Sequence, residues 1–146
     1  MPRVAIALGS NLGDRAANIK AAIAALCELA TPGEPFLTAS LHDTDPQNCP
    51  PDSPRFLNTA IDLHYSGDDP LALLEKTQAI ELALGREPSP VRNAPRVIDI
   101  DILLFGETSL KHPKLELPHP RIAERPFVLL PLQEIRPDFM RQGEIS

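Results

Sequence analysis

The stretch that most limits the fold of this chain is residues 97–105, Val-Ile-Asp-Ile-Asp-Ile-Leu-Leu-Phe. Branched aliphatic and aromatic side chains favour a β-strand, because they pack well on a pleated surface. Since side chains in a strand point alternately to its two faces, one face carries the three isoleucines and Leu104. The other face carries Asp99, Asp101 and Phe105. The sequence therefore predicts a strand with one aliphatic face and one face that bears two carboxylates.

The two aspartates admit two interpretations. Their Cα atoms stand about 6.6 Å apart on one face, so the carboxylates of Asp99 and Asp101 can converge on a hard cation, or on two cations bridged by a phosphate. Alternatively, they keep the outer face of an edge strand soluble. Arg92 and Arg96 lie just upstream and favour the first interpretation, because guanidinium groups and metal ions together neutralise a polyphosphate.

Length and charge narrow the class of protein. The 146 residues suit a single domain over residues 1–146 with a largely aliphatic core. The net charge of -6 argues against nucleic-acid binding, which depends on a positive field. There is neither a signal peptide nor an apolar run long enough to cross a membrane, so we expect a cytoplasmic protein without a membrane partner. Cys27 and Cys49 fit no metal or redox spacing.

Hydrophobic periodicity predicts four strands, at residues 4–9, 37–41, 56–65 and 97–105, and two helices, at residues 14–30 and 69–84. The resulting βαββαβ order indicates an α+β, ferredoxin-like sandwich, in which the helices cover one face of an antiparallel sheet. Long proline-bearing loops at residues 43–55, 87–95 and 113–137 would cover the other face. At the end of the chain we expect a short helix, interrupted near Pro131, and a loose tail from Arg136.

Three smaller patterns are candidates for ligand contacts. Phe56 and Asn58 share a strand face and could bind a flat heterocycle, although for this pair alone a structural role is the better explanation. Gln78 and Glu81 lie three residues apart on a helix and could reach one ligand, but solvated polar residues are the commoner case. His119 is held between two prolines, which suits a fixed hydrogen-bond donor to phosphate.

Six motifs follow one another along the chain: Gly9-Ser10-Asn11-Leu12-Gly13, Phe56-Leu57-Asn58, Gln78-x-x-Glu81-x-x-x-Gly85-Arg86, Arg92-Asn-Ala-Pro-Arg96-x-Ile-Asp-Ile-Asp101, Pro118-His119 and Arg125-x-Phe127. In this order they closely resemble the 6-hydroxymethyl-7,8-dihydropterin pyrophosphokinases of folate biosynthesis. The resemblance covers nearly the whole chain, and six collinear motifs are far more specific than any one of them.

The resemblance implies that pyrophosphate is transferred from ATP to the hydroxymethyl oxygen of the pterin, giving AMP and the pterin diphosphate. It implies two Mg²⁺ ions at Asp99 and Asp101, which with Arg86 and Arg96 would be the catalytic residues. For ATP it implies contacts from Gln78, Glu81, Arg86, Arg92, Arg96, Ile102, His119 and Arg125, with Ile102 beside the adenine. For the pterin it implies a sandwich between Phe56 and Phe127, with hydrogen bonds from Asn58 and Thr44.

Three positions differ from residues that are common in this family, namely Asp45, Pro88 and Asn93. These differences affect which contacts are expected from the covering loops and from Thr44. They do not affect the reaction that the resemblance implies. The enzyme is expected to act as a monomer on its two small-molecule substrates. A second hypothesis is a sensor that binds a nucleotide or a pterin without catalysis, and the two hypotheses differ in whether AMP is formed.

Overall fold

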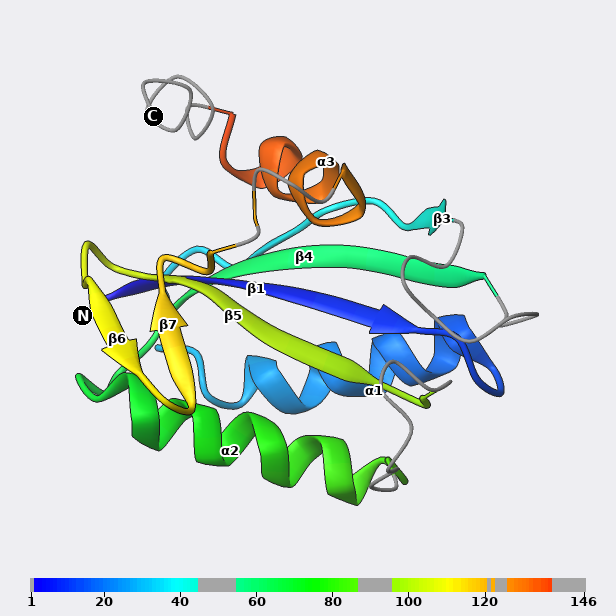
Figure 1. Ribbon diagram of the computed structural model, residues 1–146, viewed down its shortest axis with the longest axis horizontal. Coiled ribbons are helices and arrows are strands. Elements are labelled where there is room, and N and C mark those ends of the chain that lie inside the picture. Colours follow the sequence, from blue (N-terminus) through cyan, green and yellow to red (C-terminus); the bar gives the residue numbers. More distant parts are fainter. Residues whose placement is uncertain (1, 45–54, 87–95, 121, 123–125, 138–146) are drawn as a thin grey trace.

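A computed structural model of the chain describes residues 2–44, 55–86, 96–120, 122 and 126–137. As predicted, these residues form a mixed structure of α-helices and antiparallel β-strands (Figure 1). In chain order the elements are β1 (Arg3–Ser10), α1 (Arg15–Cys27), β2 (Leu37–Thr38), β3 (His42–Thr44), β4 (Phe56–His64), α2 (Pro70–Ala83), β5 (Asp99–Phe105), β6 (Leu110–His112), β7 (Leu115–Leu117) and α3 (Pro126–Ile135). The second predicted strand is found as two short strands, β2 and β3.

The main sheet has the strand order β2-β4-β1-β5, and β3 also pairs with β4. Since β1 lies between β4 and β5, it aligns residues that are distant in the sequence. Gly9 is the register partner of Asn58 on one side and of Asp99 on the other. Two residues earlier, Ala7 is the partner of Asp101. The polar residues of β4 and β5 therefore meet on one face, across the small residues of β1.

The helices α1 and α2 cover the opposite face of the sheet (Figure 1). Each begins at a capping aspartate: Asp14 accepts a hydrogen bond from the N–H of Ala17 at 3.1 Å, and Asp69 accepts one from the N–H of Leu71 at 3.0 Å. The core between helices and sheet contains Val4, Ile6, Leu8, Ile19, Ala22, Leu26, Ile61, Leu63, Leu73, Ile98, Ile100 and Ile102. In the described part of the chain, no helix is both long and apolar enough to cross a membrane.

Strict alternation along β5 ends at a bulge. The pairing of β1 with β5 shifts by one residue at Leu103, which has no register partner on β1. As a result Phe105 returns to the core under the helices, and Leu104 packs with the core on the other face. The predicted faces of these two residues were wrong, because an extra residue reverses the alternation beyond it.

The helix α3 lies on the face of the sheet away from α1 and α2 (Figure 1). A second, smaller core joins it to the sheet and consists of Ala5, Ala7, Ala60, Leu103, Ile122, Val128, Leu132 and Ile135. Part of the expected cover of this face by residues 113–137 is thus a helix, α3, whereas α1 and α2 lie on the other face as expected. The helix also continues through Pro131, where an interruption was predicted. Three alanines on the sheet surface leave room for the helix to approach closely.

An ion pair holds the end of α3 to the sheet. Arg136 donates to the two carboxylate oxygens of Asp62 in β4, from Nη2 at 2.8 Å and from Nε at 3.1 Å. Arg3 of β1 donates to the same carboxylate, which is only 2% exposed. Burial of an aspartate is tolerated here because guanidinium groups from two elements pair with it. The prediction of a loose tail from Arg136 onwards was wrong at Arg136 itself.

A second polar contact joins α3 to the segment that contains β3. The carboxylate of Glu134 accepts hydrogen bonds from the N–H of Ser40 at 2.8 Å and from its hydroxyl at 2.7 Å. Its Oε1 also lies 2.6 Å from Nε2 of His42. The two hydrogen bonds from Ser40 and the contact with His42 lower the pKa of Glu134 from 4.5 to about 2.

We predict that replacing Leu132 by alanine lowers the free energy of unfolding by about 2–5 kcal/mol, because the side chain is fully buried and its removal leaves a cavity. The measurement is urea denaturation followed by circular dichroism. Leu130→Ala in the same helix is the matched control, since Leu130 is 51% exposed and should change stability by about 0.5 kcal/mol or less. Equal effects of the two substitutions would contradict this packing of α3.

We also predict that Glu134 makes stability depend on pH. Its pKa is lower in the folded chain than in the unfolded one, so its contribution is fully present above 4.5 and is lost as the pH falls towards 2. Glu134→Gln lacks this group. The free energy of unfolding of this variant, relative to that of the parent, should therefore rise as the pH falls from 4.5 towards 2. Urea denaturation at a series of pH values measures the difference, and parallel curves for the two proteins would refute the assignment.

Candidate active site

The two aspartates of β5 lie on the face of the sheet that α1 and α2 leave uncovered, as the alternation predicts. Asp99 and Asp101 are half-buried, whereas Ile98, Ile100 and Ile102 are at most 5% exposed in the core beneath the strand. Side chains on one strand face lean in the same direction, and Gly9 and Ala7 of β1 present little bulk beside them. The carboxylates therefore border an area of the sheet built from small residues.

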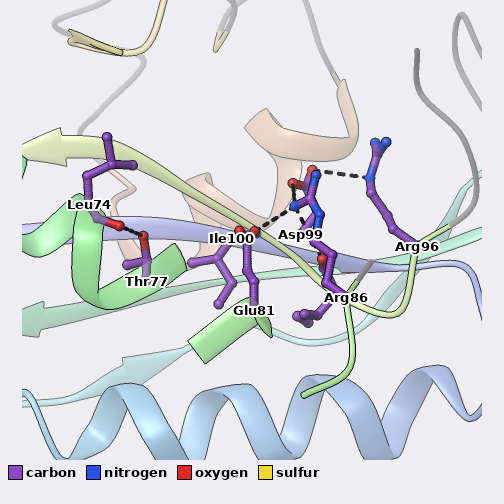
Figure 2. A network of polar contacts seen from close by, with 8 residues as sticks. Leu74, Thr77, Glu81, Arg86, Arg96, Asp99 and Ile100 are labelled. Carbon is purple, nitrogen blue, oxygen red and sulfur yellow. Dashed lines mark hydrogen bonds and ion pairs between the residues drawn. The ribbon is translucent and has the colours of Figure 1, made fainter. Parts of the chain in front are cut away.

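Arg86 is the centre of the polar network in Figure 2. Its Nη1 donates to Glu81 at 2.7 Å and to Asp99 at 3.0 Å. The chain can bring this side chain back towards β5 because Gly85 adopts a φ of +100°, a conformation that favours glycine. The N–H of Arg86 donates to the carbonyl of Glu81 at 3.0 Å, which closes the end of α2. The helix thus ends as predicted, one residue before Gly85 or earlier.

Glu81 is a buried carboxylate at the last turn of α2. Besides the bond from Arg86, its Oε2 accepts a hydrogen bond from the N–H of Ile100 at 2.8 Å. Burial raises the pKa of Glu81, and the hydrogen bond from Ile100 and the charge of Arg86 oppose that rise. The sequence alone favoured solvated roles for Gln78 and Glu81. Gln78 is indeed exposed, but Glu81 joins a helix, an arginine and the strand of the aspartates.

Arg96 lies on the other side of Asp99, with its Nε 3.7 Å from Oδ2 (Figure 2). Its guanidinium carbon lies 5.1 Å from the centre of the Phe56 ring, within the range of a cation–π contact. The backbone of Arg96 is held by Asn11: its N–H donates to the Asn11 side chain at 2.8 Å, and the N–H of Asn11 donates to its carbonyl at 3.2 Å. Arg96 thus connects the aspartates of β5 to the aromatic ring on β4.

Sequence reasoning missed the part played by Asn11. Asn11 entered only as a member of the motif from Gly9 to Gly13, whereas in the structure it positions the start of the segment that leads into β5. Asn11 is 1% exposed and Ser10 is completely buried. Burial of two polar residues at the end of a strand is the signal of such a role, but only a structure reveals burial.

Phe56 and Asn58 are both buried, at 9% and 6% exposure, and lie beside Gly9. A Cβ atom added to Gly9 would stand 2.8 Å from Oδ1 of Asn58 and 3.5 Å from Cδ1 of Phe56. Gly9 is therefore required for the observed position of the Asn58 side chain. On the far side of β4, Thr44 is the register partner of Phe56 and lies in β3.

The remaining predicted site residues differ in where they lie. The N–H of His119 donates to the carbonyl of Leu103 at 2.9 Å, so its half-exposed side chain is carried close to β5, beyond Asp101. The side chain of Ile102 is 2% exposed and belongs to the core under the helices. Arg92 and Arg125 lie outside the described residues, as do the departures Asp45, Pro88 and Asn93, and the side chains of Thr44 and Phe127 are not described.

The donor set around β5 fits a hard divalent cation carried in with a phosphate. Among the described residues, no group of three or more His, Cys, Asp or Glu side chains could hold a metal ion by itself. Mg²⁺ is commonly bound by one or two carboxylates together with phosphate oxygens and water. The pair Asp99 and Asp101 matches that pattern, and Arg86 and Arg96 add positive charge for the phosphates.

The family model described as 7,8-dihydro-6-hydroxymethylpterin-pyrophosphokinase (HPPK) matches residues 5–137 of this chain. The chain belongs to this family. Two curated relatives carry the name 2-amino-4-hydroxy-6-hydroxymethyldihydropteridine pyrophosphokinase. The Bacillus subtilis relative is 45% identical over 89% of this chain and 75% of its own length, and the Pseudomonas aeruginosa relative is 44% identical over 93% of this chain and 82% of its own.

A solved structure described as HPPK-DHPS in complex with substrates has a similar fold. It matches this chain with a TM-score of 0.64 at 15% sequence identity, over 93% of this chain and 40% of that one. At this identity the likeness concerns the fold alone. The fold of this HPPK family member is therefore shared with one part of a longer chain.

We predict that Gly9→Ala lowers the free energy of unfolding by about 1–3 kcal/mol, because the added methyl group overlaps the Asn58 side chain. The amide resonances of the Asn58 side chain should move in NMR spectra. Adding Gly9→Ala to the Asn58→Ala variant should cost less than adding it to the parent, since the overlapping atom is gone. Identical costs in the two backgrounds would show that the close approach does not hold Asn58.

Proposed function

We propose that this HPPK family member transfers pyrophosphate from ATP to 6-hydroxymethyl-7,8-dihydropterin, and so acts as a 2-amino-4-hydroxy-6-hydroxymethyldihydropteridine diphosphokinase. The observation that carries the proposal is the position of Arg96. It lies between the acidic strand β5 and the Phe56 ring, and thus joins a region suited to phosphates to one suited to a flat ring. The names of the relatives support the same reaction.

In the proposed reaction the hydroxymethyl oxygen of the pterin attacks the β-phosphorus of ATP. The bond from that phosphorus to the oxygen shared with the α-phosphate breaks, AMP leaves, and the hydroxyl proton is released. Such a transfer depends on positioning and on charge stabilisation rather than on a covalent catalyst. When bound at Asp99 and Asp101, two Mg²⁺ ions would neutralise phosphate charge. Arg86 and Arg96 would stabilise the charge on the transferred group.

We assign the other residues of the site as follows. For ATP the proposed contacts are Arg92, Arg125 and His119 at the phosphates, with Gln78 near the nucleotide and Ile102 at the adenine. Because the Ile102 side chain is buried, its contact would have to come from the backbone. For the pterin they are Phe56, Phe127, Asn58 and Thr44. Glu81 would act indirectly, by holding Arg86 and the edge of β5.

We also infer that the fold is ferredoxin-like. The sheet order β2-β4-β1-β5, with α1 and α2 on one face, supports this inference. Residues 1–146 would form one catalytic domain, since elements from β1 to α3 pack on the same sheet. The monomeric state and the cytoplasmic location stay predictions from the sequence.

The test is to incubate the chain with ATP, Mg²⁺ and 6-hydroxymethyl-7,8-dihydropterin, and to separate the products by liquid chromatography. We expect AMP and the pterin diphosphate in equal amounts. Asp99→Asn should lower kcat by about 10²–10³-fold, because it removes a carboxylate that would hold Mg²⁺ at the phosphates and that pairs with Arg86. Asp68→Asn, a change of the same kind at an exposed position before α2, is the matched control and should leave kcat unaltered.

Binding of both substrates without any AMP would overturn the proposed reaction and favour the sensor hypothesis. Turnover by Asp99→Asn at the rate of the parent would leave the reaction standing but refute the role of Asp99. The Asp68→Asn control separates the effect of Asp99→Asn from a general effect of removing one negative charge.

A further inference from the structure

One carboxylate, that of Glu134, joins α3 to the segment that leads into β3. It accepts two hydrogen bonds from Ser40, at 2.7 and 2.8 Å, and contacts Nε2 of His42 at 2.6 Å. These residues are separated by 92 and 94 positions in the chain. We call this group of Glu134, Ser40 and His42 the β3–α3 contact.

The β3–α3 contact lies next to the proposed pterin residues. His42 is the register partner of Asn58, and Thr44 is the register partner of Phe56. Directly opposed residues of an antiparallel pair have their side chains on the same face, with Cβ atoms about 5 Å apart. His42 is therefore the cross-strand neighbour of Asn58, on the face that Glu134 approaches.

The strand β3 is also held through Asp43, which pairs with Arg15 of α1 at 3.3 Å and with Arg55 at 2.9 Å. Both are exposed ion pairs, which add little to the hold on the strand. It is only three residues long, and in the described part of the chain it pairs with β4 alone. A short strand with one neighbour gains little from its own ladder of hydrogen bonds. The contact from α3 adds to this hold, because it fixes the backbone N–H of Ser40, just before the strand, and the ring of His42, its first residue.

The helix α3 does not need Glu134 for its own attachment to the sheet. Leu132 is fully buried in the second core, and Arg136 pairs with the buried Asp62 near the other end of β4. Glu134 is by contrast 38% exposed, at the margin of this packing. Its contacts thus act on β3 more than on α3.

We propose that Glu134 is a positioning residue for the pterin: it holds β3 against β4 and so sets the place of Asn58 and Thr44. This inference rests on the proposed function. It goes further by assigning a role in pterin affinity to three residues, Ser40, His42 and Glu134, that lie outside the family motifs described above. Glu134 touches neither substrate in this scheme, so its loss should alter pterin binding and leave ATP binding as it is.

The test compares steady-state kinetics of the parent and of Glu134→Gln. The glutamine keeps an oxygen for Ser40 but loses the charge beside His42. We expect the KM for the pterin to rise about tenfold, since hydrogen bonds to a charged group are among the stronger ones, while the KM for ATP and kcat change less than about twofold. Glu75→Gln, an exposed position on α2, is the matched control and should change none of these values.

Two further variants separate positioning from a loss of overall stability. Asp62→Asn weakens the attachment of α3 at Arg136, so it should lower the melting temperature without a comparable rise in the KM for the pterin. His42→Phe keeps a ring beside Asn58 but removes the contact with Glu134, so it should raise that KM in the same direction as Glu134→Gln. An unchanged pterin KM in Glu134→Gln or in His42→Phe, or an equal rise in Asp62→Asn, would overturn the proposal.

Hydrogen exchange without ligands provides a readout that does not depend on turnover. Amides of residues 40–44 should exchange faster in Glu134→Gln than in the parent, and amides of β1 should not. A parent chain that forms no AMP would refute the proposed reaction, whereas the exchange comparison would still decide whether Glu134 holds β3. Equal exchange at residues 40–44 in both proteins would refute the positioning role even if the parent is an active enzyme.

Discussion

The arrangement of the site depends on the hydrogen bonds of one buried carboxylate, that of Glu81 (Figure 2). It binds Arg86 and the N–H of Ile100, and Arg86 in turn binds Asp99. Removing a carboxylate from water is costly, and here the cost is offset by a paired guanidinium and a backbone donor. The end of α2 and the edge strand β5 are therefore joined through charge, and Arg86 is held in position beside Asp99 by the fold itself.

The two faces of the sheet differ in the size and polarity of their side chains. Aliphatic residues under α1 and α2 build the main core, whereas the other face carries small residues along β1. At one end of that face, Ala5 and Ala7 accommodate α3 and its core. Towards the other end, Gly9 leaves room between Asn58 and Asp99. Small side chains thus permit helix packing along one half of the strand and the close approach of Asn58 along the other.

Much of this organisation follows from local sequence. Alternation along residues 97–105 was sufficient to put Asp99 and Asp101 on the face away from the helices. Helix boundaries at Asp14, Asp69 and Gly85 follow from capping chemistry, which acts within one turn of the chain. The reason is the same in each case: a strand period of two residues and the geometry of a helix end are properties of the backbone itself.

The sequence by itself thus determined which side chains share a strand face up to the bulge, where α1 and α2 begin, where α2 ends, and which chemistry the acidic strand can support. Only the tertiary structure decided the bulge at Leu103, the burial of Glu81, the bond from Asn11 to the start of the β5 segment, and the contact of Glu134 with Ser40. Each of these depends on contacts between residues far apart in the chain. The free energy of these contacts comes from burial and from pairing of side chains in the folded molecule. The hydrophobic periodicity of a single segment carries no information on either.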